Sequence, residues 1–386
     1  MREVLGELLE WWSDGQSVGV ATVVATWRSA PRPAGASMLV GPDGTAVGSV
    51  SGGCVEGAVY ELAQQVVDDG APVLHRYGVS DGDALAVGLT CGGVLDVFVE
   101  KVSRETFPDL DKVAADIASS QPVAVVTVVA HTDPTWIGRR LIVRPDGAEQ
   151  PVRGGLGSRR ADDAVTDDVR GLLAQGRSTL LTYGPDGQRR GEGMRVFCSA
   201  YAPKPRLLVF GAIDFAAAVA RVGSFLGYRV TVCDARPVFA TPVRFPDADE
   251  VIVEWPHRYL RRQAEVGALD SRTVITVLTH DPKFDVPLLE VALRIPVVAY
   301  VGAMGSRRTH DDRLARLREA GVTDDELAGL SSPIGLDLGA RTPEETAVSI
   351  AAEIIALRWG GVGERLGATT GAIHHGPDLA RELPRT

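Results

Sequence analysis

The sequence predicts an α/β protein: a duplicated N-terminal α/β module followed by a Rossmann-like domain with a doubly wound parallel sheet. Three observations support this prediction: repeated segments in the first half, a proline-rich break near residue 203, and a regular alternation of apolar strands and helices after that break. The 386 residues are enough for several buried cores. We expect the first copy at 1–103, the second copy at 104–202, the Rossmann-like domain at 206–360 and a flexible tail at 361–386.

The duplication is visible as short segments that return in the same order, 103–106 residues later. They are Val20–Ala25 and Val125–Ala130, Met38–Gly44 and Leu141–Gly147, and Tyr77–Gly78 and Tyr183–Gly184. One match could arise by chance, because Pro-Asp-Gly is a common turn. Three ordered matches at nearly one spacing favour duplication. In each copy, strands enclose one amphipathic helix, which we expect at 55–67 and at 162–174.

The second half begins at a linker predicted by Pro203 and Pro205, because proline favours an extended backbone and blocks helix continuation. Beyond it, continuous apolar strands separated by helices predict a parallel sheet covered on both faces. These strands are expected at 206–211, 229–234, 250–254, 273–278 and 297–301. Thr342, Pro343 and Glu345 predict the start of the last helix, with a cap, a first-turn proline and an acid three residues after the cap.

Composition and charge exclude several classes of protein. The net charge of −10 argues against a nucleic-acid partner. No apolar run reaches the roughly 18–20 residues that span a bilayer, so we expect no membrane association. The first ten residues alternate acids with leucines rather than forming the apolar core of a signal peptide, which predicts a cytoplasmic protein. The four cysteines form no CxxC pair, so a zinc ribbon is not supported.

The segment around Cys54 is the first candidate site. Gly52 and Gly53 precede this cysteine at the predicted first turn of a helix. Glycines let backbone N–H groups approach an anion, and a helix N-terminus favours negative charge and the thiolate form of a cysteine. Arg28 and Arg32, in the loop after the first strand, would add positive charge if that loop packs beside Cys54. The alternative is that Cys54 is a small buried residue in a tight turn.

A second Cys-Gly-Gly sequence begins at Cys91, just before a strand. A functional role for Cys91, a packing role, and a pairing with Cys54 all remain open at this stage. The second copy has neither thiol at the corresponding helix start, 154–160. We therefore expect the first copy to carry a site and the second to support it. Cys198 and Cys233, inside apolar runs, are expected in the core.

The first turn of the Rossmann-like domain carries an incomplete dinucleotide motif. Gly211 makes the expected strand-to-helix turn, and Asp234 stands 23 residues later, near the place of a ribose-binding acid. Ile213 replaces a glycine that would let the backbone approach a pyrophosphate, and Asp214 places a negative charge there. A nucleotide site and a purely structural turn at Gly211 are therefore both compatible with the sequence.

Two further loops are expected at the carboxyl edge of the same sheet, where doubly wound folds bind ligands. His280 follows one strand, as either a proton donor or an ordinary loop residue. The other loop opens a helix and contains glycines, a hydroxyl and the paired arginines Arg307 and Arg308, which suit an anionic group, with a simple helix cap as the alternative for the serine. Its candidate residues are Gly302, Gly305, Ser306 and Arg307.

Several long motifs together resemble the XdhC/CoxI family. The N-terminal resemblance lies in Arg-Pro-Ala-Gly-Ala-Ser-Met-Leu-Val at 32–40 and Ser-Val-Ser-Gly-Gly-Cys-Val-Glu at 49–56. The C-terminal resemblance lies in segments 279–281, 300–308, 333–339, 342–345 and 350–354. The match covers about residues 1–103 and 205–358, and the middle copy matches less distinctly. Where the family commonly has Gly-Ala-Gly-His, this chain has Gly211-Ala212-Ile213-Asp214, which weakens any nucleotide contact at that turn.

The resemblance implies an accessory factor that binds molybdenum cofactor, protects it during sulfuration and delivers it to a xanthine dehydrogenase-type molybdoenzyme. It implies that Cys54 contacts the metal or its labile sulfur, with Gly52 and Gly53 making room. A cysteine desulfurase-type protein would supply the sulfur. A homodimer is compatible with an uncovered sheet edge.

Two other functions stay open at this point. One is an NAD(P)-dependent oxidoreductase that uses the Rossmann-like domain. The other is a scaffold that docks a sulfurtransferase to its client without holding cofactor. The sequence favours an accessory protein over an enzyme without deciding between them. It also leaves open the client, the sulfur donor, and any metal role of His374 and His375 in the tail.

Overall fold

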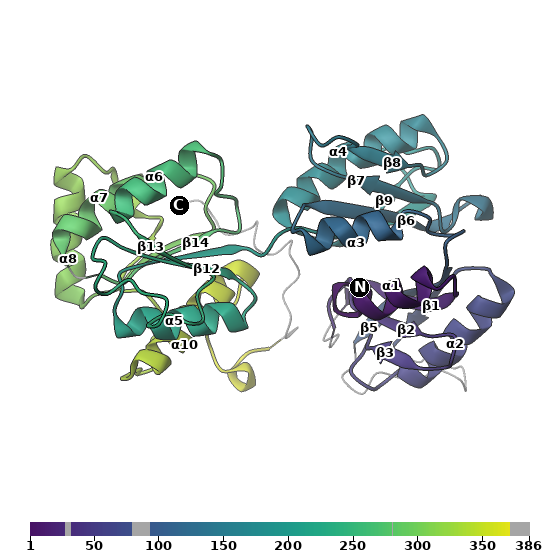
Figure 1. Ribbon diagram of the computed structural model, residues 1–386, viewed down its shortest axis with the longest axis horizontal. Coiled ribbons are helices and arrows are strands. Elements are labelled where there is room, and N and C mark those ends of the chain that lie inside the picture. The colour runs from purple at the N-terminus through teal and green to yellow at the C-terminus, as the bar shows by residue number, and fades with distance from the viewer. Residues whose placement is uncertain (28–31, 79–92, 280, 371–386) are drawn as a thin grey trace. The chain divides into compact units, whose positions relative to one another are not determined.

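The computed structural model describes residues 1–27, 32–78, 93–279 and 281–370 (Figure 1). Within these ranges the chain forms two compact units, the first ending at Pro203 and the second beginning at Lys204. No helix in the described ranges is long and apolar enough to cross a bilayer.

The first unit contains two five-stranded antiparallel sheets with the same strand order, β3-β2-β1-β5-β4 and β8-β7-β6-β10-β9. The first copy consists of α1 (Leu5–Ser13), β1 (Val18–Trp27), β2 (Ser37–Val40), β3 (Ala46–Gly48), α2 (Glu56–Asp69), β4 (Val73–Tyr77) and β5 (Val94–Val102). The second consists of α3 (Leu110–Ala118), β6 (Val123–His131), β7 (Arg140–Val143), β8 (Val152–Gly154), α4 (Arg159–Gln175), β9 (Thr179–Tyr183) and β10 (Met194–Tyr201). The predicted duplication is confirmed.

Glycines at corresponding positions show how closely the two copies follow one plan. Gly48 ends β3 with a φ of 85°, and Gly154 ends β8 with a φ of 86°. A Cβ atom at either position would overlap a backbone carbonyl oxygen of the neighbouring strand, that of Ser37 or that of Arg140. A side chain is therefore excluded at both places by conformation and by space.

Corresponding residues of both copies contribute to shared apolar clusters inside the first unit. Val24 and Val129 lie at the same irregularity in β1 and β6, and they pack together with Phe98 and Phe197. The larger cluster that includes α1 and α3 takes equivalent residues from both sheets: Val18, Val20 and Leu39 from the first, and Val123, Val125 and Ile142 from the second. Each copy thus buries one sheet face against material from the other copy.

The second unit is a six-stranded parallel sheet with the order β13-β12-β11-β14-β15-β16. Its strands are β11 (Arg206–Phe210), β12 (Arg229–Asp234), β13 (Glu250–Val253), β14 (Val274–Val277), β15 (Tyr300–Ala303) and β16 (Leu330–Ser331). Its helices are α5 (Asp214–Phe225), α6 (Pro256–Glu265), α7 (Pro282–Leu293), α8 (Arg307–Glu319), α9 (Asp324–Leu327) and α10 (Pro343–Trp359). The prediction of a Rossmann-like domain is confirmed.

Helices cover both faces of this sheet. One apolar cluster takes residues from α5 and α10, and another takes residues from α6, α7 and α8 (Figure 1). The predicted cap of α10 is present, because Thr342 and Glu345 each bond the other's backbone N–H group. The strand expected at 297–301 begins instead at Tyr300. Pro296 and Val297 form a turn there, where proline has no N–H group for a sheet.

Candidate functional site

The loop between β3 and α2 folds around the carboxylate of Glu56. Four backbone N–H groups donate to this carboxylate, over distances of 2.8–3.2 Å, and so do the hydroxyls of Ser49 and Ser51. The N–H donors are Ser51, Gly52, Gly53 and Val55. One side chain therefore bonds six donors within a seven-residue loop, 49–55.

These donors set the charge state of Glu56. Burial by itself would raise the pKa of this carboxyl group, but the hydrogen bonds from Ser51 and Ser49, together with those from the backbone, lower the pKa to about 2. The anion that the sequence predicted at the glycine N–H groups is thus supplied by the chain itself. This role of Glu56 was not predicted from the sequence, although an acid three residues after Gly53 has the spacing of a helix-capping box.

Cys54 lies before α2, which begins at Glu56, so its prediction in the first helical turn was wrong. The N–H groups of Gly53 and Val55 donate to the Glu56 carboxylate, so the chain stays in a loop conformation up to Glu56. The Cys54 side chain is partly buried and packs against the apolar core of the first copy, while its N–H group bonds the Ser51 hydroxyl at 3.0 Å. Cys54 therefore packs against the core and is also partly exposed to solvent.

The space over the two preceding glycines is open. Gly52 and Gly53 are exposed, with φ angles of 79° and 118°, and a Cβ atom on either would meet nothing within 4 Å. Their conformation favours glycine, while their surroundings leave room for a ligand beside Cys54. Arg32, which was expected to favour the thiolate if its loop packed beside Cys54, forms an ion pair of 2.8 Å with Glu3. Arg28 and Cys91 lie outside the described residues.

Asp234, the candidate ribose-binding acid, stabilises the turn after β11. Gly211 has a φ of 110°, and the N–H group of the next residue, Ala212, donates to the buried carboxylate of Asp234 at 2.8 Å. Arg236 donates three further hydrogen bonds to the same carboxylate, over 2.8–2.9 Å. Burial would raise the pKa of Asp234, but Arg236 and Ala212 outweigh it and lower this pKa. A ribose hydroxyl would have to compete with these donors.

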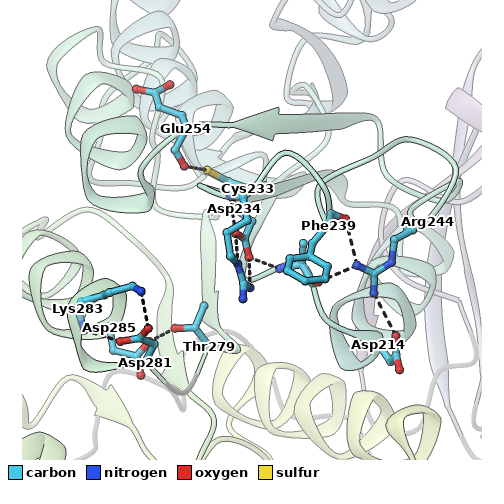
Figure 2. Close-up of polar contacts among 12 residues, drawn as sticks. Asp214, Cys233, Asp234, Phe239, Arg244, Glu254, Thr279, Asp281, Lys283 and Asp285 are labelled. Carbon is cyan, nitrogen blue, oxygen red and sulfur yellow. Dashed lines mark hydrogen bonds and ion pairs between the residues drawn. The ribbon is translucent and has the colours of Figure 1, made fainter.

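Asp214, at the phosphate position of the turn, pairs with Arg244 at 3.2 Å (Figure 2). Arg244 also donates to the carbonyl groups of Ala212 and Phe239, each at 3.2 Å. The Phe239 ring contacts two guanidinium groups, with centroid distances of 4.7 Å to Arg236 and 5.7 Å to Arg244. The edge of the sheet at β11 and β12 is therefore held together by internal ion pairs.

The loop before α8 shows the structural role that the sequence left as an alternative. The Ser306 hydroxyl accepts the N–H group of Thr309 at 3.1 Å and so caps the helix. Gly302 leaves no room for a Cβ atom between Tyr300 and Ile334, and a Cβ atom on Gly305 would come within 3.1 Å of Thr309. The side chain of Arg307 is exposed at the start of α8. His280 lies outside the described residues.

A buried ion pair that sequence analysis missed holds these edge loops together. Arg313 of α8 and Asp285 of α7 pair at 3.2 Å, with side chains only 3% and 5% exposed. Arg313 also donates to the Met304 carbonyl at 2.7 Å and to the Ser332 hydroxyl at 3.0 Å, and Thr279 donates to Asp285 (Figure 2). Burial raises the pKa of Asp285 to about 6, although Arg313 opposes this rise. Three loops are thereby fixed to two helices.

The predicted metal role of Cys54 involves no protein ligand cluster in the described part of the chain. Across those residues, no group of three or more His, Cys, Asp or Glu side chains could hold a metal ion. Cys198 and Cys233 are buried, as expected for core residues, and burial raises the pKa of the Cys198 thiol to about 12. A metal brought to Cys54 would therefore have to arrive with ligands of its own.

Known proteins resemble this chain over most of its length. A Bacillus subtilis protein described as a probable subunit of xanthine dehydrogenase is 29% identical over 92% of this chain and 96% of its own length. The "Molybdenum cofactor insertion chaperone PaoD" of Escherichia coli is 26% identical over 92% of this chain and 88% of its own. A crystal structure described as a xanthine dehydrogenase from Bacillus halodurans superposes with a TM-score of 0.65 at 26% identity, covering 94% of this chain and 97% of that one.

Family models match both halves of the chain. The model described as "XdhC and CoxI family" matches residues 11–78 and, separately, 117–184, which are the two copies of the first unit. The model described as "XdhC Rossmann domain" matches residues 207–354 of the second unit. The duplicated antiparallel module, the parallel sheet and these matches agree, and the chain belongs to the XdhC and CoxI family.

Proposed function

We propose that this protein binds molybdenum cofactor and assists its sulfuration and its insertion into a xanthine dehydrogenase-type molybdoenzyme. The relative from Escherichia coli that carries the name of a molybdenum cofactor insertion chaperone supports this role. The structural observation that carries the proposal is the loop 49–55, where Cys54 stands beside two exposed glycines with open space above them. The sulfur donor in this proposal is a cysteine desulfurase-type protein.

The residues of this loop fit a metal contact better than a phosphate contact. A cysteine sulfur is a soft ligand that suits molybdenum or its sulfido group, and the open space over Gly52 and Gly53 admits a bulky cargo. The N–H groups that could receive a phosphate already bond Glu56, so a phosphate would have to displace a carboxylate. In this proposal Glu56 keeps the loop in one conformation, and Cys54 makes the transient contact to the cargo.

An NAD(P)-dependent oxidoreductase has less support in this geometry. Asp234 is engaged by Ala212 and Arg236, and Asp214 places a second carboxylate at the turn where a pyrophosphate would lie. Binding of a dinucleotide would require these ion pairs to rearrange. Absence of a thermal shift on titration with NADH and NADPH is the result that our proposal predicts.

The proposal is tested by anaerobic incubation with molybdenum cofactor, desalting, and measurement of molybdenum and pterin per chain. The proteins compared are wild type, Cys54→Ser, and the control Cys233→Ser, in which a buried thiol far from the loop in sequence is changed. We expect wild type and the control to retain both components, and Cys54→Ser to lose them. Equal retention by Cys54→Ser would contradict the role of Cys54, and no retention by wild type would contradict cofactor binding itself. Activation of a client enzyme without any retention would favour the scaffold.

A further inference from the structure

The last helix of the second unit, α10, is apolar on two of its faces. One face packs into the core of this unit through residues that include Ala347 and Ile354. The other face is open to solvent, although it carries Val348, Ile355 and Trp359, which are 53%, 43% and 51% exposed. A helix that is apolar all round is normally buried on all sides. The exposed face of α10 therefore has the composition of an interface.

The apolar residues of this face follow the spacing of a coiled-coil seam. Val348, Ala352, Ile355 and Trp359 are separated by four, three and four residues. This spacing places the four side chains in one stripe along the helix. Ala352 is half-buried, and the other three residues are exposed. These four residues are named the α10 stripe. A stripe of this kind is suited to pairing with another helix.

The α10 stripe fits a second copy of itself in the antiparallel direction. Its spacing is the same from both ends, so a two-fold axis between Ala352 and Ile355 brings two stripes into register. A smaller residue then faces a larger one at each level, with Ala352 opposite Ile355 of the second copy and Val348 opposite Trp359. A parallel pair would place Trp359 against Trp359 and Ala352 against Ala352, so one level would be overfilled and another underfilled.

The charges at the two ends of α10 favour the same arrangement. Glu344 and Glu345 lie in the first turn of the helix, and Arg358 lies in the last turn. Antiparallel pairing brings the acidic start of each helix toward the basic end of the other, and it sets the two helix dipoles in opposite directions. Parallel pairing would bring like charges together. Side-chain size and charge therefore both favour an antiparallel pair of identical helices.

We propose that the α10 stripe is a dimer interface, at which two copies of this chain pair through antiparallel α10 helices. Val362 and Leu366, which directly follow the helix, are 71% and 63% exposed and add apolar surface near its end. Pairing removes the apolar stripes of both copies from water. The sequence suggested a homodimer at a sheet edge, whereas this proposal assigns a helix. It goes beyond the proposed function, because it involves neither Cys54 nor molybdenum.

Analytical ultracentrifugation of the full chain, over a wide range of protein concentrations, measures the dissociation constant of the dimer. Ile355→Glu places a charge in the middle of the stripe, and the control Val243→Glu changes a residue that is 90% exposed in the loop after β12. We expect wild type and the control to dimerise alike. Ile355→Glu should raise the dissociation constant about a hundredfold or more, because symmetry places the new charge in the interface twice. Far-UV circular dichroism and thermal unfolding check that the variants are folded.

Disulfide cross-linking tests the direction of pairing, with Val348→Cys and Trp359→Cys made as separate proteins. In the antiparallel pair, position 348 of one copy faces position 359 of the other. The two copies of position 348 lie roughly 16 Å apart along the helices, which is too far for a disulfide. On mild oxidation, we expect a mixture of the two variants to form linked dimers on a non-reducing gel. Each variant alone should show no more cross-linking than wild type, which controls for the native thiols.

The proposal is overturned if wild type is monomeric at every concentration, or if Ile355→Glu dimerises as tightly as wild type. Loss of the dimer in Val243→Glu to the same extent would overturn the assignment of the interface to the α10 stripe. Cross-linking of Val348→Cys with itself, above the level of wild type, would overturn the antiparallel arrangement. None of these measurements uses molybdenum cofactor, so failure of this proposal and failure of the proposed function are distinguishable.

Discussion

The two copies of the first unit share a scaffold and differ in one loop. In the first copy seven residues, 49–55, separate the third strand from the helix, whereas in the second copy four residues, 155–158, make the same connection. The longer loop holds the cysteine and closes around Glu56. In the shorter loop Ser158 caps α4 through the N–H group of Ala161, and Asp162 accepts the N–H group of Leu156.

This difference shows that the loop before the helix can change in sequence and conformation while the preceding strands, β3 and β8, end in the same way. Gly48 and Gly154, which begin the two loops, keep the same conformation and the same close approach to a neighbouring strand. The copies have also become complementary. Asp96 and Arg195 occupy corresponding positions opposite Ala25 and Ala130, and they now pair with each other at 3.0 Å.

The largest expected effect tests whether the two glycines are equivalent. Gly48→Ala and Gly154→Ala should each lower the free energy of unfolding by about 3 kcal/mol, because the new Cβ atom meets a carbonyl oxygen at a positive φ. Urea denaturation of the full chain measures this value. Gly147→Ala is a control for positive φ alone, because its Cβ atom meets nothing within 4 Å. If one of the two substitutions lowered the free energy of unfolding and the other did not, Gly48 and Gly154 would not be equivalent.

The next effect concerns the ion pair between the copies. Asp96→Asn should lower the free energy of unfolding by about 2–3 kcal/mol, because the buried carboxylate bonds both Arg76 and Arg195. Asp116→Asn is the control, because the Asp116 carboxylate pairs with a single arginine, Arg144, and is 22% exposed where that of Asp96 is 3% exposed, so the change should cost less. Equal losses of unfolding free energy for the two variants would show that the Asp96 pair between the copies stabilises the fold no more than the Asp116 pair does.

A smaller effect concerns the loop carboxylate of the first copy. Glu56→Gln should lower the free energy of unfolding by about 1–2 kcal/mol at pH 7, because an uncharged amide replaces a carboxylate that bonds six donors. Asp162→Asn is the matched change in the second copy, where Leu156 donates to the carboxylate, and it should cost less.

The pH dependence sharpens this prediction. The pKa of Glu56 falls from its ordinary value of 4.5 to about 2 on folding, so the folded state favours the ionised form. The stability gained in this way is fully present above about pH 5 and is lost as the pH falls toward 2. The difference between wild type and Glu56→Gln should shrink over this interval. A difference that stays constant from pH 6 to pH 3 would contradict the assigned ionisation.

The smallest effect separates the two ways of starting a helix. Ser158→Ala should cost about 1 kcal/mol, because it removes the side-chain cap of α4. Ser119→Ala, at an exposed hydroxyl that bonds the Ala115 carbonyl after α3, is the control and should cost less. Thermal unfolding compares the two variants. If both changes have the same effect, the hydroxyl of Ser158 does not act as a cap.

Much of the fold could be predicted because periodicity and repeated segments report on backbone structure directly. The repeat at Met38–Gly44 and Leu141–Gly147 located β2 and β7, and the Thr342 cap located α10. The interactions of the site were harder to predict. The six donors to Glu56 depend on how one side chain reaches back over a glycine loop, which hydrophobic patterns do not encode. The pair of Glu100 with Arg140 joins strands from different copies, so no local pattern indicates it.

The central claim is that the loop of the first copy carries the cofactor site on a scaffold that both copies share. A chimera in which residues 49–55 are replaced by the sequence of residues 155–161, the equally long segment between Gly154 and Asp162, tests it directly. We predict that this chimera keeps the far-UV circular dichroism spectrum of wild type and retains no molybdenum or pterin after anaerobic incubation and desalting. Retention at the wild-type level by a folded chimera would contradict the claim.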